Sequence, residues 1–302
     1  MKKALSIVGG IFCFITCILL FLTQVGFITF TSVKSLITKS SISEVIKEID
    51  IKEVISTSPT STSDLYGFFD TLGFSVEETN QILESDSLKN FLDEYLYNNI
   101  DNIVNDKDVS FDYNSIVKLV DDVESETNLT LKNKQALLNL LQANYSEIEK
   151  SINISNYIKD NLNENDMLLL RALLGKTIMI AFIVIFIIIY LIMCLFRWSM
   201  YKPLIWYGIT TSLSSFIMMQ AFLGINAVKN LITEDAKKFE FIISPVLKVI
   251  KNKGLIISMI MLAVGILMIV AFYFINKQAK ENEKNEDFSL LESDQAEPTQ
   301  TL

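Results

Sequence analysis

Four long stretches of this chain contain no Lys, Arg, Asp, Glu or His: residues 5–31, 177–196, 203–228 and 255–276. An α-helix rises about 1.5 Å per residue, so about 20 apolar residues cross the roughly 30 Å hydrocarbon core of a bilayer. Each stretch reaches that length. Because half of the residues are hydrophobic, the composition as a whole also favours a membrane protein. The sequence therefore predicts four transmembrane helices.

A polar segment, residues 33–170, separates the first apolar stretch from the second. It holds 11 lysines and 25 acidic residues, a net charge of −14 in a chain whose total is −9. A segment of this length can fold alone. Its negative charge repels the phosphates of DNA and RNA, so a nucleic-acid partner is not expected. Cationic groups or a protein surface are the expected partners.

This acidic segment has the periodicity of helices, because leucine, isoleucine and aromatic residues recur every three or four positions. Ser75 and Glu78 have the spacing of a capping box, which marks a helix start. The apolar face that follows is interrupted near Asp86. Further helices are expected after Asp112 and from about Thr130. The predicted fold is all-α: four transmembrane helices plus an acidic soluble helical bundle inserted between helices 1 and 2.

The predicted organisation has four parts. Residues 1–32 form an N-terminal signal-anchor helix, because the apolar run exceeds the roughly 7–15 residues of a cleaved signal peptide. Residues 33–170 form the soluble domain. Residues 171–276 form a three-span domain (177–196, 203–228 and 255–276) with a basic amphipathic connector at 229–253. Residues 277–302 form a short charged tail, which is expected to be disordered.

The connector is a candidate membrane-surface contact, because apolar and basic side chains fall on different faces of a helix there. The residues concerned are Phe239, Ile242, Ile243, Val246, Val249, Ile250, Lys237, Lys238, Lys248 and Lys251. Pro245 is expected to bend this helix. An equally weighted alternative is an ordinary connector whose apolar side packs on the spans.

The third apolar stretch is the most polar of the four. Thr211, Ser215 and Gln220 form a candidate intramembrane polar cluster. Such side chains in membrane helices usually bond their own or a neighbouring helix, so packing is favoured over a pore lining. Gly9, Gly10 and Gly26 of the first stretch could allow close helix contact. No ionisable residue lies at membrane depth, which argues against an energy-coupled transporter.

Several kinds of catalytic and metal chemistry lack their residues. The chain has no histidine, and its three cysteines, Cys13, Cys17 and Cys194, lie in predicted spans, so the soluble segment has no disulfide framework. No phosphate-binding glycine loop, nucleophile elbow or zinc pair occurs. Alternating oxygen ligands begin at Asp106, but Phe111 replaces the glycine of a calcium loop and Val117 its glutamate. We expect neither an enzyme nor a bound metal or cofactor.

Positive charge does not fix the orientation. If the N-terminus is inside, seven basic residues flank the spans on the inner side and ten on the outer side, six of them in the connector. However, long loops translocate regardless of charge, and the first span, preceded here by Lys2 and Lys3, usually dominates. We expect a cell-membrane protein with both termini cytoplasmic and residues 33–170 extracytoplasmic, although the connector's lysines oppose this orientation.

The stretch GFFDTLGFSVEETNQILESDSLKNFLDEYLYNNIDNIV resembles uncharacterised multi-span membrane proteins of low-GC Gram-positive bacteria. These share a basic start, one anchor, an outer helical domain and three further spans. The resemblance would cover most of the chain, is one of pattern, and transfers no functional residues.

The functional hypothesis is a non-enzymatic integral membrane protein. Its extracytoplasmic helical domain would bind a protein or envelope component, and the chain would act as a sensor, scaffold or accessory subunit. The alternative is an accessory or pore-forming subunit of a membrane transport system, suggested by the hydroxyl-rich third span. In either case the lipid bilayer and a protein partner, or a second copy of the chain, are the expected partners.

Overall fold

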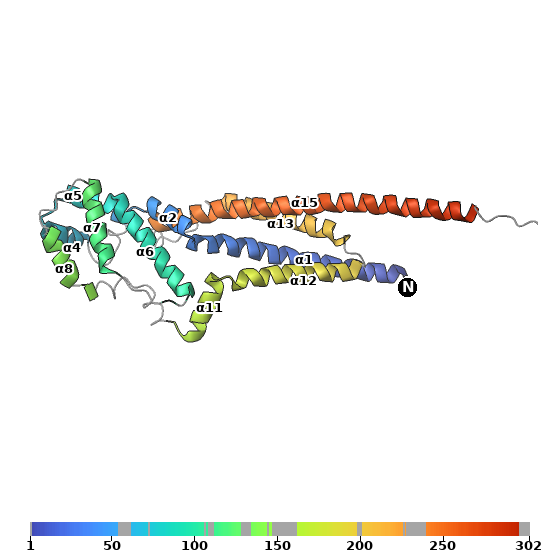
Figure 1. The fold of residues 1–302 in the computed structure, drawn as a ribbon, viewed down its shortest axis with the longest axis horizontal. Helices are drawn as coiled ribbons and strands as arrows, with labels where there is room; N and C mark the ends of the chain where they lie inside the picture. The colour runs from blue at the N-terminus through green and yellow to red at the C-terminus, as the bar shows by residue number, and fades with distance from the viewer. Residues whose placement is uncertain are drawn as a thin grey trace, which may run out of the picture. The chain divides into compact units, whose positions relative to one another are not determined.

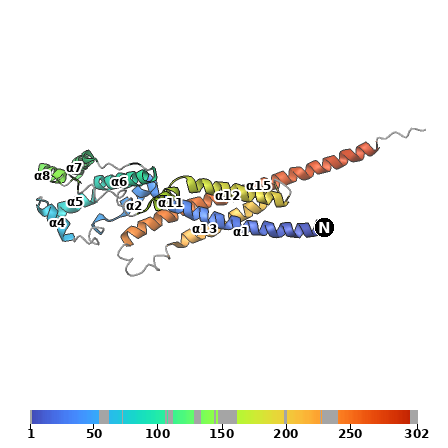
Figure 2. The ribbon, with the colours of Figure 1, turned by 90° about the horizontal axis from the view of Figure 1, so that it is seen from below.

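The computed structural model describes residues 2–53, 62–71, 73–105, 107, 112–127, 134–143, 145–146, 162–197, 201–225, 227 and 240–295. All regular secondary structure in these ranges is helical (Figures 1 and 2). The chain divides into two compact units. The apolar unit comprises Met1–Thr31, Met179–Phe222 and Gly254–Leu302, and the acidic unit comprises Ser32–Ile178 and Leu223–Lys253.

Four long helices contribute to the apolar unit: α1 (Lys2–Lys34), α12 (Thr177–Arg197), α13 (Pro203–Leu223) and α15 (Glu240–Gln295). Helices α1 and α12 run antiparallel, because the ring of Phe12 stacks on that of Phe196 and the ring of Phe27 packs edge-on against that of Phe182. Helix α13 runs antiparallel to α15, with Phe222 beside Gly254 and Gly208 beside Gly265. Figure 1 shows the two pairs as adjacent long helices.

Within the part of the chain that the structure describes, three helical segments are long and apolar enough to cross a membrane: Gly9–Ile37, Thr177–Phe196 and Glu240–Asn282. The sequence predicted four. Helix α13 forms over 21 residues, as expected. It falls below the apolarity of the other three because hydroxyl residues, glycine and Gln220 occupy so many of its positions.

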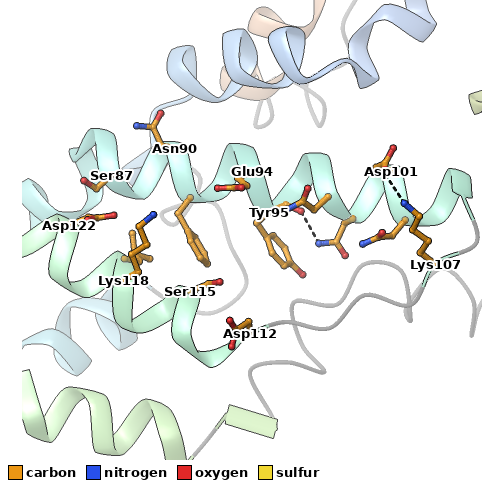
Figure 3. A pocket seen from close by; sticks show the side chains of 15 residues that line it. Ser87, Asn90, Glu94, Tyr95, Asp101, Lys107, Asp112, Ser115, Lys118 and Asp122 are labelled. Atoms are coloured by element: carbon orange, nitrogen blue, oxygen red, sulfur yellow. Dashed lines mark hydrogen bonds and ion pairs between the residues drawn. The ribbon is translucent and has the colours of Figure 1, made fainter.

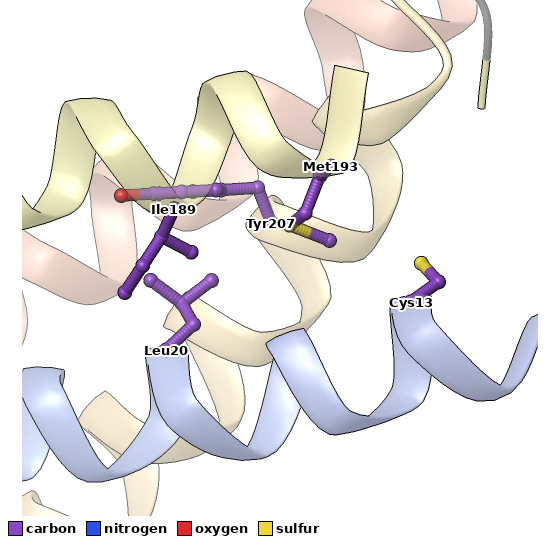
Figure 4. Close-up of a cluster of buried hydrophobic side chains, with 5 residues drawn as sticks. All are labelled: Cys13, Leu20, Ile189, Met193 and Tyr207. Carbon is purple, nitrogen blue, oxygen red and sulfur yellow. The ribbon is translucent and has the colours of Figure 1, made fainter. Parts of the chain in front are cut away.

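A buried cluster joins three helices of the apolar unit (Figure 4). It consists of Cys13 and Leu20 from α1, Ile189 and Met193 from α12, and Tyr207 from α13. Cys13 is 3% exposed, and Leu20 and Met193 are fully buried. Each large side chain removed from solvent or lipid in this way contributes packing contacts that hold the helices at a fixed separation.

The backbones of α13 and α15 approach each other closely in the apolar unit. A Cβ atom added at Gly208 would lie 2.7 Å from the carbonyl oxygen of Gly265. One added at Gly265 would lie 2.8 Å from the backbone nitrogen of Ser212. Only glycine lets two backbones come this near, a common feature of membrane helix pairs. Of the glycines suggested by the sequence, Gly10 has no atom near its Cβ position, so it makes no close contact.

The acidic unit contains the remaining helices. They are α2 (Lys39–Glu48), α4 (Thr62–Thr71), α5 (Val76–Glu84), α6 (Asp86–Asn105), α7 (Tyr113–Thr127), α8 (Lys134–Ala143) and α11 (Glu164–Leu174), with a short 3-10 turn, η1 (Ser35–Ile37), after α1. Ile116 and Val120 of α7 form the centre of a core that includes Phe91 and Tyr95 of α6 and Leu141 of α8.

The predicted capping box is confirmed. The Ser75 hydroxyl accepts a hydrogen bond from the backbone N–H of Glu78 at 3.2 Å, and a Glu78 carboxylate oxygen accepts one from the backbone N–H of Ser75 at 2.7 Å. Gly73, just before it, has φ 86°, a left-handed conformation that favours glycine. The interruption predicted near Asp86 is also confirmed, because α5 ends at Glu84 and α6 begins at Asp86.

The tail after Asn276 is predicted to be disordered beyond a first helical turn or two, whereas α15 is helical to Gln295. Residues 277–295 contain no glycine or proline and are rich in Lys, Glu and Gln, which favour helix. The helix expected from about Thr130 begins at Lys134 in the described residues, and Thr130 lies outside them.

Candidate functional site

The candidate site is a groove between α6 and α7. These helices run antiparallel, and Glu126 near the end of α7 joins them. Its two carboxylate oxygens accept hydrogen bonds from the backbone N–H groups of Asp86 at 2.7 Å and Ser87 at 2.8 Å. The Ser85 hydroxyl accepts the next N–H, that of Leu88, at 3.2 Å. Three N–H groups at the start of α6, which the helix itself cannot pair, are thus satisfied.

The Glu126 carboxylate is held in its charged form. Partial burial raises its pKa, but hydrogen bonds from the Ser87 side chain and the backbone N–H groups of Asp86 and Ser87 outweigh this effect. The pKa of Glu126 is therefore lowered from its usual value. This ionised group at the start of a helix also interacts favourably with the helix dipole.

The groove has a volume of about 730 Å³ and is open to solvent (Figure 3). This volume falls within the range typical of ligand sites. Its lining is dominated by carboxylates, amides and hydroxyls, with two aromatic rings: Ser87, Asn90, Phe91, Glu94, Tyr95, Asn98, Asn99, Asp101, Asn102, Lys107, Asp112, Ser115, Lys118, Leu119 and Asp122.

The charges of the groove are mostly negative. Four carboxylates line it against two lysines. Asp101 lies 4.0 Å from Lys107, an exposed pair at one end of the groove. Asp112 caps α7, since its carboxylate accepts the backbone N–H of Asn114 at 3.0 Å. The excess of carboxylates gives the groove a negative potential that attracts cationic groups.

One amide at the groove is incompletely paired. Asn99 is fully buried, and its Nδ2 donates to the carbonyl oxygen of Tyr95 at 2.9 Å. No described residue donates a hydrogen bond to its Oδ1. A buried amide oxygen without a donor is destabilising by about 1–3 kcal/mol. No sequence signal marks this residue, since a single Asn on a helix full of Asn and Asp is not distinctive.

A second polar cluster lies inside the apolar unit. Gln24 of α1 is fully buried, and its Nε2 donates to the Thr211 hydroxyl of α13 at 2.5 Å. The Ser214 hydroxyl donates to Gln24 Oε1 at 2.6 Å. Thr211 in turn donates to the carbonyl oxygen of Tyr207 at 2.7 Å. The cluster ties α1 to α13 through complementary pairs, as polar groups do between membrane helices.

The structure brings together part of the polar cluster suggested by the sequence. Thr211 is in the Gln24 cluster. Ser215 is buried on the same helix, and its hydroxyl has no hydrogen-bond partner among the residues that the structure describes. Gln220 is on the exposed side of α13, apart from both. Gln24 was missed because one glutamine within a long apolar run breaks no periodicity and the residues it bonds are almost 190 positions away.

The connector residues lie partly in the described chain. Lys237, Lys238 and Phe239 fall outside it. Val249 is 1% exposed, and Lys248 forms an ion pair with Glu48 of α2. The other members, Ile242, Ile243, Val246, Ile250 and Lys251, are partly buried. This first part of α15, up to Lys253, belongs to the acidic unit. Helix α15 includes Pro245 without ending there.

No group of three or more His, Cys, Asp or Glu side chains suited to a metal ion occurs among the residues that the structure describes. The aspartates of the calcium-like run lie mostly outside those residues. Comparisons with protein-family models, with curated proteins and with solved structures found no match to this chain.

Proposed function

We propose that this chain is a non-enzymatic, multi-pass membrane protein whose acidic helical domain binds a protein partner in the α6–α7 groove. The observation that carries the proposal is the groove itself, a polar, negatively charged concavity of about 730 Å³ on a domain attached to apolar helices. Side chains placed as in a known catalytic set do not line it. Recognition by charge and hydrogen bonding is the chemistry that remains.

The partner we propose is a basic segment of a protein. Carboxylates of Glu94, Asp101 and Asp122 would pair with lysine or arginine, while Phe91 and Tyr95 offer ring faces for the guanidinium of arginine. Exposed amides and hydroxyls along the groove would bond the backbone of such a segment. The sensor or scaffold role follows from the connection of this domain to the spans.

We also propose four membrane crossings, with α13 as the additional one. Helix α12 runs antiparallel to α1, and α15 runs antiparallel to α13. Helix α13 lies between α12 and α15 in the chain. The hydroxyls that lower its hydropathy bond within the unit, as those of Thr211 and Ser214 do. A helix polar on an inward face can cross a bilayer in this way.

With four crossings, both termini lie on the same side of the cell membrane. We propose that this side is cytoplasmic and that residues 33–170 are extracytoplasmic. The polar side chains of the spans do not favour the transport alternative, because Gln24, Thr211 and Ser214 bond one another and Gln220 lies apart from them. Such bonding supports a packing role for the cluster.

The test is site-specific photo-crosslinking in cells. A photo-reactive amino acid replaces Asn90 or Ser115, both exposed at the groove, and Gln81, exposed on α5 outside it, is the matched control. We expect a crosslinked protein at Asn90 and Ser115 and none at Gln81.

Substitutions that remove charge test whether crosslinking requires the carboxylates of the groove. Combining each crosslinking position with Glu94→Gln and Asp122→Asn should abolish the product, whereas Lys118→Gln should preserve it. Crosslinking that is equal at Gln81, or unaffected by neutralising the carboxylates, would contradict the proposal.

A further inference from the structure

Helix α11 exposes leucines on one side while packing on the acidic unit with the other. Met167 is buried, and the Nε of Arg171 donates to the carbonyl oxygen of Ile103 in α6 at 3.3 Å. Away from these contacts, Leu168 is 62% exposed, Leu169 63% and Leu173 37%. Burying one leucine side chain stabilises the folded protein by about 1.5–3 kcal/mol. Leaving three leucines exposed to water therefore gives up a substantial part of the stabilisation that burial would provide.

The exposed side of α11 changes character along the helix. Its first turn is polar, with Glu164, Asn165 and Asp166, and Asn163 caps it by accepting the backbone N–H of Asp166 at 2.9 Å. The leucines occupy the later turns. Thus the acidic end is the one farther along the chain from the membrane span, and the apolar end is the nearer one.

Chain connectivity places the leucines close to the bilayer. Helix α11 ends at Leu174, and the candidate span Thr177–Phe196 begins three residues later. Leu173 and Leu169 lie only four and eight residues before the first residue of that span. The headgroup region of a bilayer is about 5–8 Å deep on each side. A helix that lies along the bilayer surface at this point places its leucines in that region.

Basic groups surround the junction between α11 and the span. Lys176 is exposed, and Lys34, at the end of α1, donates a hydrogen bond from Nζ to the carbonyl oxygen of Gly175. Lys34 and Lys176 thus mark the ends of two apolar helices at one level. Ammonium groups at this position are suited to lipid phosphates, while neighbouring apolar side chains enter the acyl boundary.

We propose that α11 is an interfacial helix that inserts Leu168, Leu169 and Leu173 into the surface of the protein's own bilayer. Lys34 and Lys176 contact lipid phosphates beside it. The helix seats the acidic unit on the membrane through Met167 and Arg171, which hold its other side on that unit. This inference does not depend on what the α6–α7 groove binds, because it concerns only the contact of α11 with lipid.

The experiment is depth-dependent fluorescence quenching on the full chain in lipid nanodiscs. Cys13, Cys17 and Cys194 are replaced by alanine, and an environment-sensitive dye is attached to Leu169→Cys. Glu164→Cys, in the first turn of the same helix, is the matched control. We expect loss of fluorescence at position 169 with lipids that carry a quencher just below the headgroup, and no loss at position 164.

Further measurements distinguish lipid from water, or from a second copy of the chain, as the surroundings of this face. An unquenched label at position 169 overturns the proposal, whether the label is in water or covered by a second copy of the chain. Quenching should occur in pure phosphatidylcholine, since apolar insertion drives it. Quenching only with added phosphatidylglycerol would indicate electrostatic contact without insertion and would also overturn it. With a label at Leu173→Cys, Leu168→Glu should abolish quenching, whereas the exposed-site control Asn165→Glu should not.

Discussion

The contact between Gly208 and Gly265 makes the strongest quantitative prediction. In a Gly208→Ala variant the new Cβ would meet the Gly265 carbonyl oxygen at 2.7 Å, the Ile269 Cγ1 at 2.8 Å and the Ile269 backbone nitrogen at 3.1 Å. Two of these three atoms belong to the backbone of α15, which cannot rotate away. The helices must separate, and overpacking of this kind costs about 1–3 kcal/mol.

A matched control removes the effect of helix propensity. Alanine favours a helix over glycine by about 1 kcal/mol wherever it is placed. Gly10→Ala gains the same propensity, but no neighbouring atom lies within 4 Å of its added Cβ. We therefore expect Gly208→Ala to be less stable than Gly10→Ala by about 1–3 kcal/mol, or about 5- to 150-fold in the equilibrium for opening the helix packing.

The buried Cys13 thiol provides the assay. It is 3% exposed in the core shared by α1, α12 and α13, so a maleimide reaches it only when that packing opens. In a variant retaining this cysteine alone, the modification rate should rise 5- to 150-fold for Gly208→Ala relative to Gly10→Ala. Equal rates in the two variants would refute the close backbone contact of α13 with α15.

Three further predictions concern the polar contacts. Gln24→Leu removes two interhelical hydrogen bonds of about 0.6 kcal/mol each, so Cys13 should react about sevenfold faster, and an unchanged rate would argue against the buried cluster. Glu126→Gln should weaken the cap of α6 by about 1 kcal/mol, giving about fivefold faster hydrogen exchange at the Ser87 amide. Because the folded-state pKa of Glu126 is lowered, its stabilisation is present above 4.5 and disappears as the pH falls through the folded value, so wild type and variant should exchange alike in acid. Lys134 bridges Asp121 and Glu124, whose hydrogen bonds raise its pKa, so Lys134→Met should lose a small stabilisation that vanishes in high salt or as the pH rises through the raised value. Exchange in α8 that is identical in the two proteins at neutral pH and low salt would contradict this.

Local sequence signals predicted much of the acidic unit. The Ser75–Glu78 capping box, the break at Ser85 and the start of α7 after Asp112 depend on residues within four positions of one another. Hydrogen bonds of this range are encoded in the spacing, so periodicity and capping rules recover them. The groove was beyond those rules, because it requires knowing that α6 and α7 lie side by side.

For the apolar helices, less of the packing could be predicted from the sequence. Length and composition identify a candidate span, but they do not show which face is inside. The importance of Gly208 and the bonds of Gln24 depend on partners in distant parts of the sequence, and neither has a local signature. The lower hydropathy of α13 was visible, but its meaning, an inward-facing polar side, required the neighbouring helices.

Accessibility from the two sides of the membrane tests the proposed four-crossing topology most directly. Single cysteines at Ser87, Ser199, Asn252 and Ser289, in a chain lacking the three native cysteines, are labelled on intact cells with a membrane-impermeant maleimide. We predict labelling at Ser87 and Asn252 alone, which requires α13 to cross the membrane and the acidic domain to face outward. Labelling at Ser87 and Ser289 alone would leave only three crossings, and labelling at Ser199 and Ser289 alone would invert the protein, so either result would contradict the account.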